Sequence, residues 1–182
     1  MTPQEIYSAL INVLDSSTTT TAYWTDTEDS DWDSDRWTAM MTSALVTAVR
    51  QVAVGTEDFI VAAKNHPDIY GRSEYLNIDV MGFVDDWSSP TVAIEHENNV
   101  LATKLRYCLW KLLVVGAPAS ILVCYIDPTG SFGRCFRSVE ALRTALQEVH
   151  DQHPDRAVYL IIGEWNKERQ ETWSEVFTLH QV

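Results

Sequence analysis

Residues 75–107 read YLNIDVMGFVDDWSSPTVAIEHENNVLATKLRY, and this stretch predicts two strands joined by a turn and followed by a helix. Side chains alternate in character along residues 76–83 and again along residues 92–98, and a strand places neighbouring side chains on opposite faces. The segment between them, DDWSSP, has the composition of a turn. We therefore expect the two strands to pair as a hairpin.

Three acidic residues of this hairpin are candidates for a functional site. Alternation places Glu95 and Glu97 on one face of the second strand, roughly 6.5 Å apart, while Val92 and Ile94 face the other way. Pairing of the strands would bring Asp79 to the same face as the two glutamates. Three carboxylates with no cation between them repel one another, and a divalent metal ion is a common remedy.

This pattern resembles the core of the PD-(D/E)XK nuclease superfamily: Asp79, a gap of fifteen residues, Glu95 and Glu97 on an apolar strand, and then a helix. The resemblance covers roughly residues 75–127. It implies that Asp79 and Glu95 bind magnesium, and that the third motif position, usually Lys, helps to generate the attacking water. Glu97 stands in that third position, so the resemblance implies that Lys104 of the following helix supplies the cation instead.

The resemblance thus implies a phosphodiesterase that acts on nucleic acid and uses Mg²⁺ or Mn²⁺. Its catalytic residues would be Asp79, Glu95, Glu97 and Lys104, and the three carboxylates would hold metal. Glu97 would either orient the attacking water or help to bind a second metal ion.

A row of residues on the predicted helix has two interpretations. Lys104, Tyr107 and Lys111 are spaced by three and four residues, which places them on one face. The row either faces phosphate groups beside the metal or forms a solvated edge whose side-chain stems cover the core. The family resemblance favours the first interpretation for Lys104.

The periodicity of the whole chain predicts an α/β fold in a single domain, residues 1–182, with N-terminal helices in residues 1–53 and a sheet core in residues 56–182. The order of elements matches a restriction-endonuclease-like αβββαβ core, a mixed central sheet flanked by helices, with an added N-terminal helix and a C-terminal strand. Helices are predicted over residues 3–14, 36–53, 98–115 and 138–151, and strands over residues 59–63, 76–83, 92–98, 119–126, 157–163 and 172–182.

Residues 16–35 form a polar, acidic segment that we expect to be an exposed loop. Its alternating aspartates from Asp29 to Asp35 suggest a calcium loop, which needs Gly at the sixth position and Glu at the twelfth. Counted from Asp29, those positions hold Ser34 and Met40. A solvated loop that ends with Asp35 as a helix cap is therefore the favoured interpretation.

The charge of the chain bears on its partners. Thirteen basic and 26 acidic residues give a net charge of −13. Phosphate contacts dominate the affinity of most nucleic-acid binders, so this charge disfavours nucleic acid as a partner unless the basic groups are concentrated in one groove. The alternative function is a catalytically inactive nuclease-like fold that binds a basic protein, inhibits it or mimics DNA. A homodimer also stays open.

The cysteines and the hydropathy of the chain predict a cytoplasmic protein. Cys108, Cys124 and Cys135 lack the spacing of a metal site, and the first two lie in apolar segments typical of buried free thiols. The N-terminal sequence lacks the basic region of a secretory signal, and no apolar run approaches 18 residues. We expect no association with a membrane.

Overall fold

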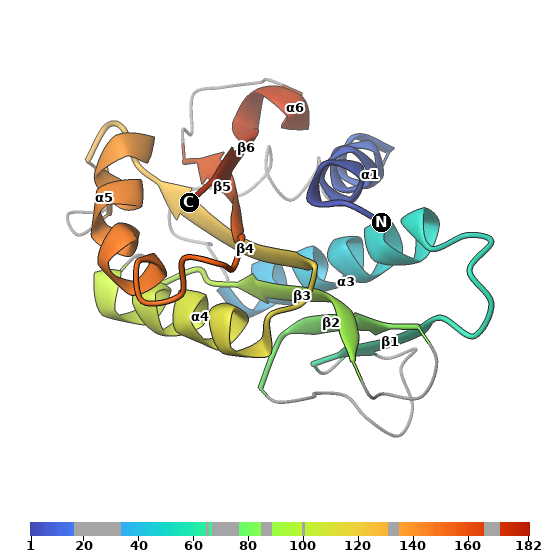
Figure 1. The fold of residues 1–182 in the computed structure, drawn as a ribbon. Coiled ribbons are helices and arrows are strands. Elements are labelled where there is room, and N and C mark those ends of the chain that lie inside the picture. Colours follow the sequence, from blue (N-terminus) through green and yellow to red (C-terminus); the bar gives the residue numbers. More distant parts are fainter. Residues whose placement is uncertain are drawn as a thin grey trace.

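One mixed, open sheet of six strands forms the centre of the computed structural model (Figure 1). The structure describes residues 1–16, 34–64, 66, 77–84, 89–99, 101–130, 135–165 and 172–182, which contain the six strands and five helices. The helices are α1 (Pro3–Ser16), α3 (Ser34–Val52), α4 (Ala102–Val115), α5 (Val139–His150) and α6 (Trp173–Val176). The strands are β1 (Ile60–Ala63), β2 (Val80–Phe83), β3 (Pro90–His96), β4 (Ala119–Ile126), β5 (Tyr159–Glu164) and β6 (Phe177–Gln181). The predicted α/β class is confirmed.

The strands lie in the sheet in the order β1-β2-β3-β4-β5-β6. β1, β2 and β3 pair antiparallel, β3, β4 and β5 pair parallel, and β6 is antiparallel to β5. β4 is buried along its whole length and parallel to both neighbours, as its continuous apolar sequence predicts.

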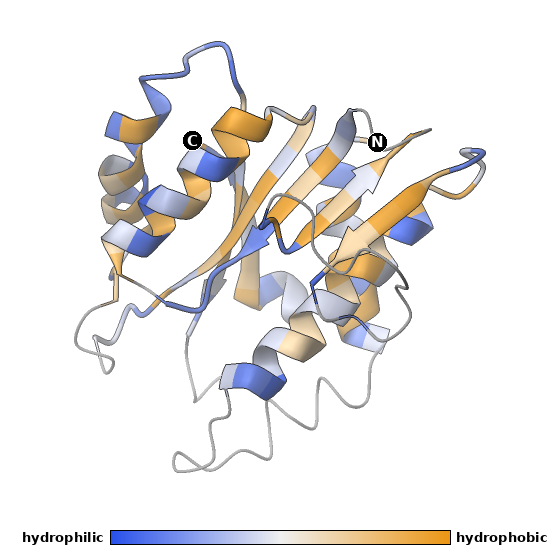
Figure 2. Cartoon of the chain, turned by 90° about the horizontal axis from the view of Figure 1, so that it is seen from below, coloured by the Kyte–Doolittle hydropathy of each residue, from blue (hydrophilic) through white to orange (hydrophobic). Residues whose placement is uncertain are grey.

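Helices cover both faces of the sheet and give the fold three layers. α1, α3 and α6 share a buried cluster with one face of the strands, and α4 and α5 share a second cluster with the other face. Figure 2 shows the hydrophobic residues concentrated in the strands between the two helical layers. The site described below lies where β1 and β3 end and β2 begins.

The predicted hairpin is present in the structure. β2 and β3 pair antiparallel, with Val80 opposite Ile94 and Met81 opposite Ala93. Ile94 lies in the buried cluster on the α3 side and Ala93 in the cluster on the α4 side, so the alternation predicted for the second strand is confirmed. It places Glu95 towards α4, on the same side as Ala93.

The first strand of the hairpin is shorter than predicted. β2 starts at Val80, and Asn77 has a left-handed backbone with φ 55°, which a regular strand does not contain. Ile78 consequently packs in the same cluster as Met81 on the α4 side, whereas strict alternation places it on the face of Val80. Asp79 comes just before the strand and not within it.

Two further boundaries differ from the predictions. α4 begins at Ala102 without a side-chain cap, because Asn99 uses its Oδ1 to accept a hydrogen bond from the backbone N–H of Leu101 at 3.0 Å. The predicted strand 172–182 begins with the short helix α6, because Thr172 and Glu175 form a capping box that starts a helical turn. β6 then occupies the rest of that segment.

The acidic segment is only partly described. Residues 17–33, which carry most of the predicted loop and of the calcium interpretation, lie outside the described residues. The structure describes the end of the segment, Ser34 and Asp35. α3 begins at Ser34, so Asp35 lies in its first turn and is not the cap that the sequence suggests. A carboxylate in a first helical turn favourably meets the positive end of the helix dipole.

No helix in the described part of the chain is long and apolar enough to cross a membrane. The cytoplasmic location stays a prediction.

Candidate functional site

A cavity of 1180 Å³ lies between α3 and α4, at the ends of β1 and β3. The segment before β2 and the segment after β3 also line it. Its lining includes four carboxylates and three lysines: Asp35, Asp79, Glu95, Glu97, Lys64, Lys104 and Lys111. The cavity therefore contains all four residues that the sequence predicts for the site.

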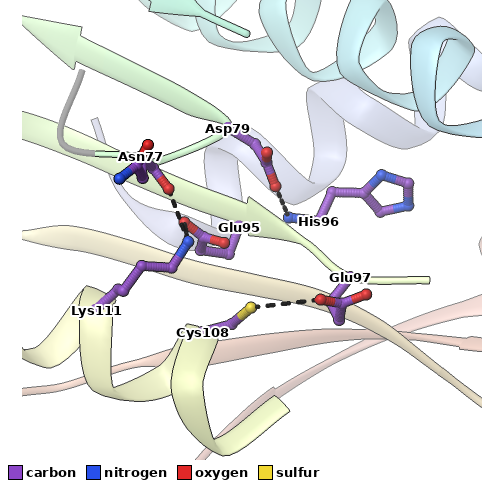
Figure 3. A network of polar contacts seen from close by, with 7 residues as sticks. All are labelled: Asn77, Asp79, Glu95, His96, Glu97, Cys108 and Lys111. Carbon is purple, nitrogen blue, oxygen red and sulfur yellow. Dashed lines mark hydrogen bonds and ion pairs between the residues drawn. The ribbon is translucent and has the colours of Figure 1, made fainter. Parts of the chain in front are cut away.

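Glu95 and Lys111 form an ion pair inside this cavity (Figure 3). Lys111 Nζ lies 2.7 Å from Glu95 Oε1, and it also donates a hydrogen bond to the backbone carbonyl of Asn77 at 2.7 Å. The side chain of Lys111 is 13% exposed and that of Glu95 is 3% exposed. Burial and the charge of Asp79 raise the pKa of Glu95 from 4.5 to about 7, although Lys111 opposes the shift. Burial lowers the pKa of Lys111, but the pairing with Glu95 outweighs it, so the net shift is upward.

Asp79 lies just before β2, beside the end of β3 that carries Glu95. The register of Val80 opposite Ile94 brings Asp79 level with Glu95. The Oδ2 atom of Asp79 accepts a hydrogen bond from the backbone N–H of His96 at 2.9 Å (Figure 3). Burial raises the pKa of Asp79, and this hydrogen bond lowers it by less. The carboxylate is thus fixed to β3 by a main-chain contact.

Glu97 lies towards α4 but has different partners from Glu95. Its Oε1 accepts a hydrogen bond from the backbone N–H of Asn99 at 2.7 Å, and the Cys108 thiol lies 3.7 Å from its Oε2 (Figure 3). Burial, together with the charges of Glu95 and Glu97, raises the pKa of Cys108, which keeps the thiol protonated as a donor. Glu97 is only half-buried.

The cation beside the carboxylates is Lys111, whereas the sequence pointed to Lys104. Lys104 is exposed on the rim of the cavity, and it forms no ion pair with any carboxylate that the structure describes. The two lysines are seven residues apart on one face of α4, so their spacing indicates both equally. The position of α4 over the sheet brings Lys111, and not Lys104, next to Glu95.

A buried hydrogen-bonded chain supports the site from the α3 side. Trp37 Nε1 donates to the hydroxyl oxygen of Tyr125 at 2.9 Å, and that hydroxyl lies 2.8 Å from His96 Nε2. Because the indole can only donate, we infer that the Tyr125 proton goes to Nε2. Burial lowers the pKa of His96 to about 3, so its ring stays neutral. This series of hydrogen bonds fixes the side chain of His96, and the backbone N–H of His96 in turn donates a hydrogen bond to Asp79.

Replacing Tyr125 by Phe tests this support. The change keeps the ring but removes a hydrogen-bond partner from Trp37 and from His96, so we expect a loss of about 2 kcal/mol in unfolding free energy. Urea unfolding measures it. Tyr159→Phe, on the half-buried start of β5, is the matched control and should change stability by less than about 0.5 kcal/mol. Equal effects of the two changes would show that the hydroxyl of Tyr125 has no structural role.

The raised pKa of Glu95 predicts a pH dependence of stability. The folded protein holds the Glu95 proton up to about pH 7, whereas the ordinary value is 4.5. The contribution of the Glu95 proton to the unfolding free energy is therefore fully present below pH 4.5 and is lost as the pH rises through 7. Relative to Glu95→Gln, we expect the wild type to lose about 2 kcal/mol between pH 5 and pH 8. Urea unfolding at constant ionic strength measures the difference.

The exposed carboxylate Glu57 offers the matched control for this titration. Glu57→Gln removes the same charge outside the cavity, so its stability relative to the wild type should stay constant over that pH range. If the unfolding free energies of the wild type and Glu95→Gln differ by the same amount at every pH, Glu95 is not protonated in the folded protein.

The carboxylates of the cavity can be compared with the ligands that a metal ion needs. Among the residues that the structure describes, no three His, Cys, Asp or Glu side chains are grouped so that they could hold a metal ion, and the three predicted carboxylates do not form such a group. Magnesium commonly uses only one or two carboxylates and keeps several waters. Asp79 and Glu95 would supply two such carboxylates, but Lys111 is already paired with Glu95, and the charges of Lys111 and Lys64 also act on Asp79.

No family model matches the chain, and neither the comparison with curated proteins nor that with solved structures finds a match.

Proposed function

We propose that the chain is a magnesium-dependent phosphodiesterase of the PD-(D/E)XK type that acts on nucleic acid. The observation that carries the proposal is that Asp79, just before β2, and Glu95 of β3 line one cavity, with the ammonium of Lys111 2.7 Å from Glu95 Oε1. The order α3-β1-β2-β3-α4-β4 supports it, because it is the αβββαβ order of that core. In this proposal Lys111 takes the place of the strand lysine.

The roles of the residues follow from their positions. Asp79 and Glu95 would hold magnesium, which supplies a Lewis acid that stabilises the charge developing on the phosphoryl group. Lys111, on the α4 side of the carboxylates, would offset the same charge through its ammonium. Glu97, half-buried beyond β3, would orient the attacking water through a carboxylate oxygen. The main-chain N–H of His96 would keep Asp79 Oδ2 in place.

The distribution of lysine bears on how an acidic chain could bind a phosphate. The chain contains four lysines, and three of them, Lys64, Lys104 and Lys111, line this one cavity. The same cavity is lined by the carboxylates of Asp35, Asp79, Glu95 and Glu97, so a bound divalent cation would have to complement these lysines before the groove attracts a phosphate. The repulsion from distant acidic residues is screened beyond about 8 Å at physiological salt.

A cleavage assay tests the proposal. End-labelled single-stranded and duplex DNA and RNA are incubated with the full chain in millimolar Mg²⁺ or Mn²⁺, or in excess chelator. We expect cleavage with metal and none with chelator. Cleavage that persists in chelator contradicts the metal-dependent mechanism.

A second function is favoured by the ion pair itself. Lys111 contacts Glu95 directly, and Glu97 stands where the family has lysine, so the fold would also suit an inactive, acidic binding protein. The absence of cleavage with every substrate and metal, in a protein that melts cooperatively, would favour this binding function over the phosphodiesterase.

A further inference from the structure

Two aromatic side chains lie exposed and stacked on the outer surface of α4. Tyr107 and Trp110 are 53% and 45% exposed, although rings of this size usually bury most of their surface. Their ring centroids are 6.0 Å apart and the ring planes differ by only 20°. We call this pair the α4 aromatic surface. Its flat, parallel faces are available to a third ring.

The α4 aromatic surface is continuous with the candidate site. Tyr107 lines the cavity, and Lys111 Nζ lies 5.3 Å from the centre of its ring. The same ammonium pairs with Glu95, so one row of contacts leads from the carboxylate through Lys111 and Tyr107 to Trp110. A ligand whose reacting group sits at Glu95 would therefore extend over these rings.

The charge of α4 is opposite to that of the chain. The helix carries Lys104, Arg106 and Lys111 and no acidic residue, while the whole protein has a net charge of −13. Lys104 and Lys111 are on the side of the helix that lines the cavity. Arg106 instead contacts α5, through Glu148 and the carbonyl of Ala145. Lys111 and Arg106 are thus paired with carboxylates, and the exposed Lys104 is the cation that the surface offers to a phosphate beside its aromatic faces.

We propose that the α4 aromatic surface stacks the bases of a single-stranded polynucleotide whose backbone enters the cavity, an inference that rests on the proposed function and names its substrate class. Bases in a duplex stack on one another, so their faces are not available to protein rings. Unpaired bases expose both faces and stack on aromatic side chains without regard to sequence. Single strands, overhangs and unpaired ends are therefore the preferred substrates.

Binding measurements in a cleavage-deficient background test this inference. Fluorescence anisotropy of a labelled oligothymidylate and of a labelled duplex of the same length is followed with the full chain carrying Asp79→Asn. We expect at least tenfold tighter binding of the single strand. Trp110→Ala should weaken that binding by about 5- to 100-fold, the range for the loss of one stacked base. Trp110→Phe should retain most of it.

Two substitutions separate stacking from other contacts. Trp110→Leu keeps the apolar bulk without an aromatic face, so it should bind as weakly as Trp110→Ala. Val114→Ala, on the same helix and 55% exposed, should bind like the parent. Lys104→Gln should reduce the slope of log affinity against log salt by about 0.7, the value for one phosphate contact with a single strand.

The following results decide whether the inference holds. Equal affinities of Trp110→Ala and its parent for the single strand, or a preference for the duplex, exclude base stacking at this surface. A wild type that sediments as a dimer, and that Trp110→Ala or Val114→Ala converts to a monomer, makes the surface an interface between copies of the chain. Trp110-dependent binding without cleavage by the wild type supports the surface and contradicts the phosphodiesterase. If Trp110→Ala cleaves every substrate as the wild type does, the phosphodiesterase is supported and base stacking on the α4 aromatic surface is contradicted.

Discussion

Replacing Asp79 by Asn is expected to lower the rate of metal-dependent cleavage by about a thousandfold, since metal stabilisation of a phosphoryl transition state amounts to several kcal/mol. Asn is nearly isosteric with Asp and can still accept the hydrogen bond from the His96 N–H. The change therefore removes the charge while the surrounding contacts keep their shape. Single-turnover cleavage at saturating protein isolates the chemical step from substrate binding.

Glu95→Gln should have a similar effect, because Glu95 is the second carboxylate of the pair. The matched controls are Asp155→Asn and Glu57→Gln, which remove exposed carboxylates outside the cavity. Both controls should cleave at the rate of the wild type. An Asp79→Asn protein that folds and cleaves within a factor of about three of the wild type would remove Asp79 from the site, because such a factor is well under 1 kcal/mol.

Replacing Lys111 by Met is expected to destabilise the fold by about 3–5 kcal/mol at pH 8, because it leaves Glu95 as an unpaired buried charge. Glu95 is only 3% exposed, and Asp79 next to it adds to the repulsion. Met keeps the length and the apolar stem of Lys, so the change tests the ammonium itself. The melting temperature should fall by about 6–20 °C, at 2–4 °C per kcal/mol for a domain of this size.

Lys104→Met is the matched control, because Lys104 lies on the same face of α4 but is exposed. It should change stability by less than about 0.5 kcal/mol. In the double variant Lys111→Met with Glu95→Gln, most of the lost stability should return, because neither charge remains. If Lys111→Met and Lys104→Met have the same melting temperature, the ion pair seen in the structure does not contribute to stability.

Local periodicity was enough to predict the hairpin and the faces of its second strand. Residues two apart on a strand share a face, so Ile94 and Glu95 had to lie on opposite sides of the sheet, and they do. The continuous apolar sequence of β4 likewise predicted a buried parallel strand. These features depend on neighbours in the sequence, which is why they can be derived without a structure.

Features that depend on distant parts of the chain could not be predicted in this way. The spacing of Lys104 and Lys111 puts both on one face, and only the position of α4 over β3 brings Lys111 to Glu95. The left-handed backbone of Asn77 interrupts the alternation before β2, and no residue type in that stretch demands it. The chain from Trp37 through Tyr125 to His96 joins three segments far apart in the sequence.

The central claim is that Asp79 and Glu95 together bind a divalent cation, and thermal unfolding with added metal tests it most directly. A cation that binds only the folded state stabilises it by RT ln(1 + [L]/Kd), about 2.7 kcal/mol at a hundredfold excess over Kd. At about 2–4 °C per kcal/mol this corresponds to a rise of roughly 5–10 °C in melting temperature. Magnesium and manganese are titrated at constant ionic strength, because the acidic surface responds to salt in general. We expect the wild type, Glu57→Gln and Asp155→Asn to show this rise, and Asp79→Asn and Glu95→Gln to show none. A wild type that does not respond, or Asp79→Asn and Glu95→Gln proteins that respond as fully as the wild type, would contradict the metal site.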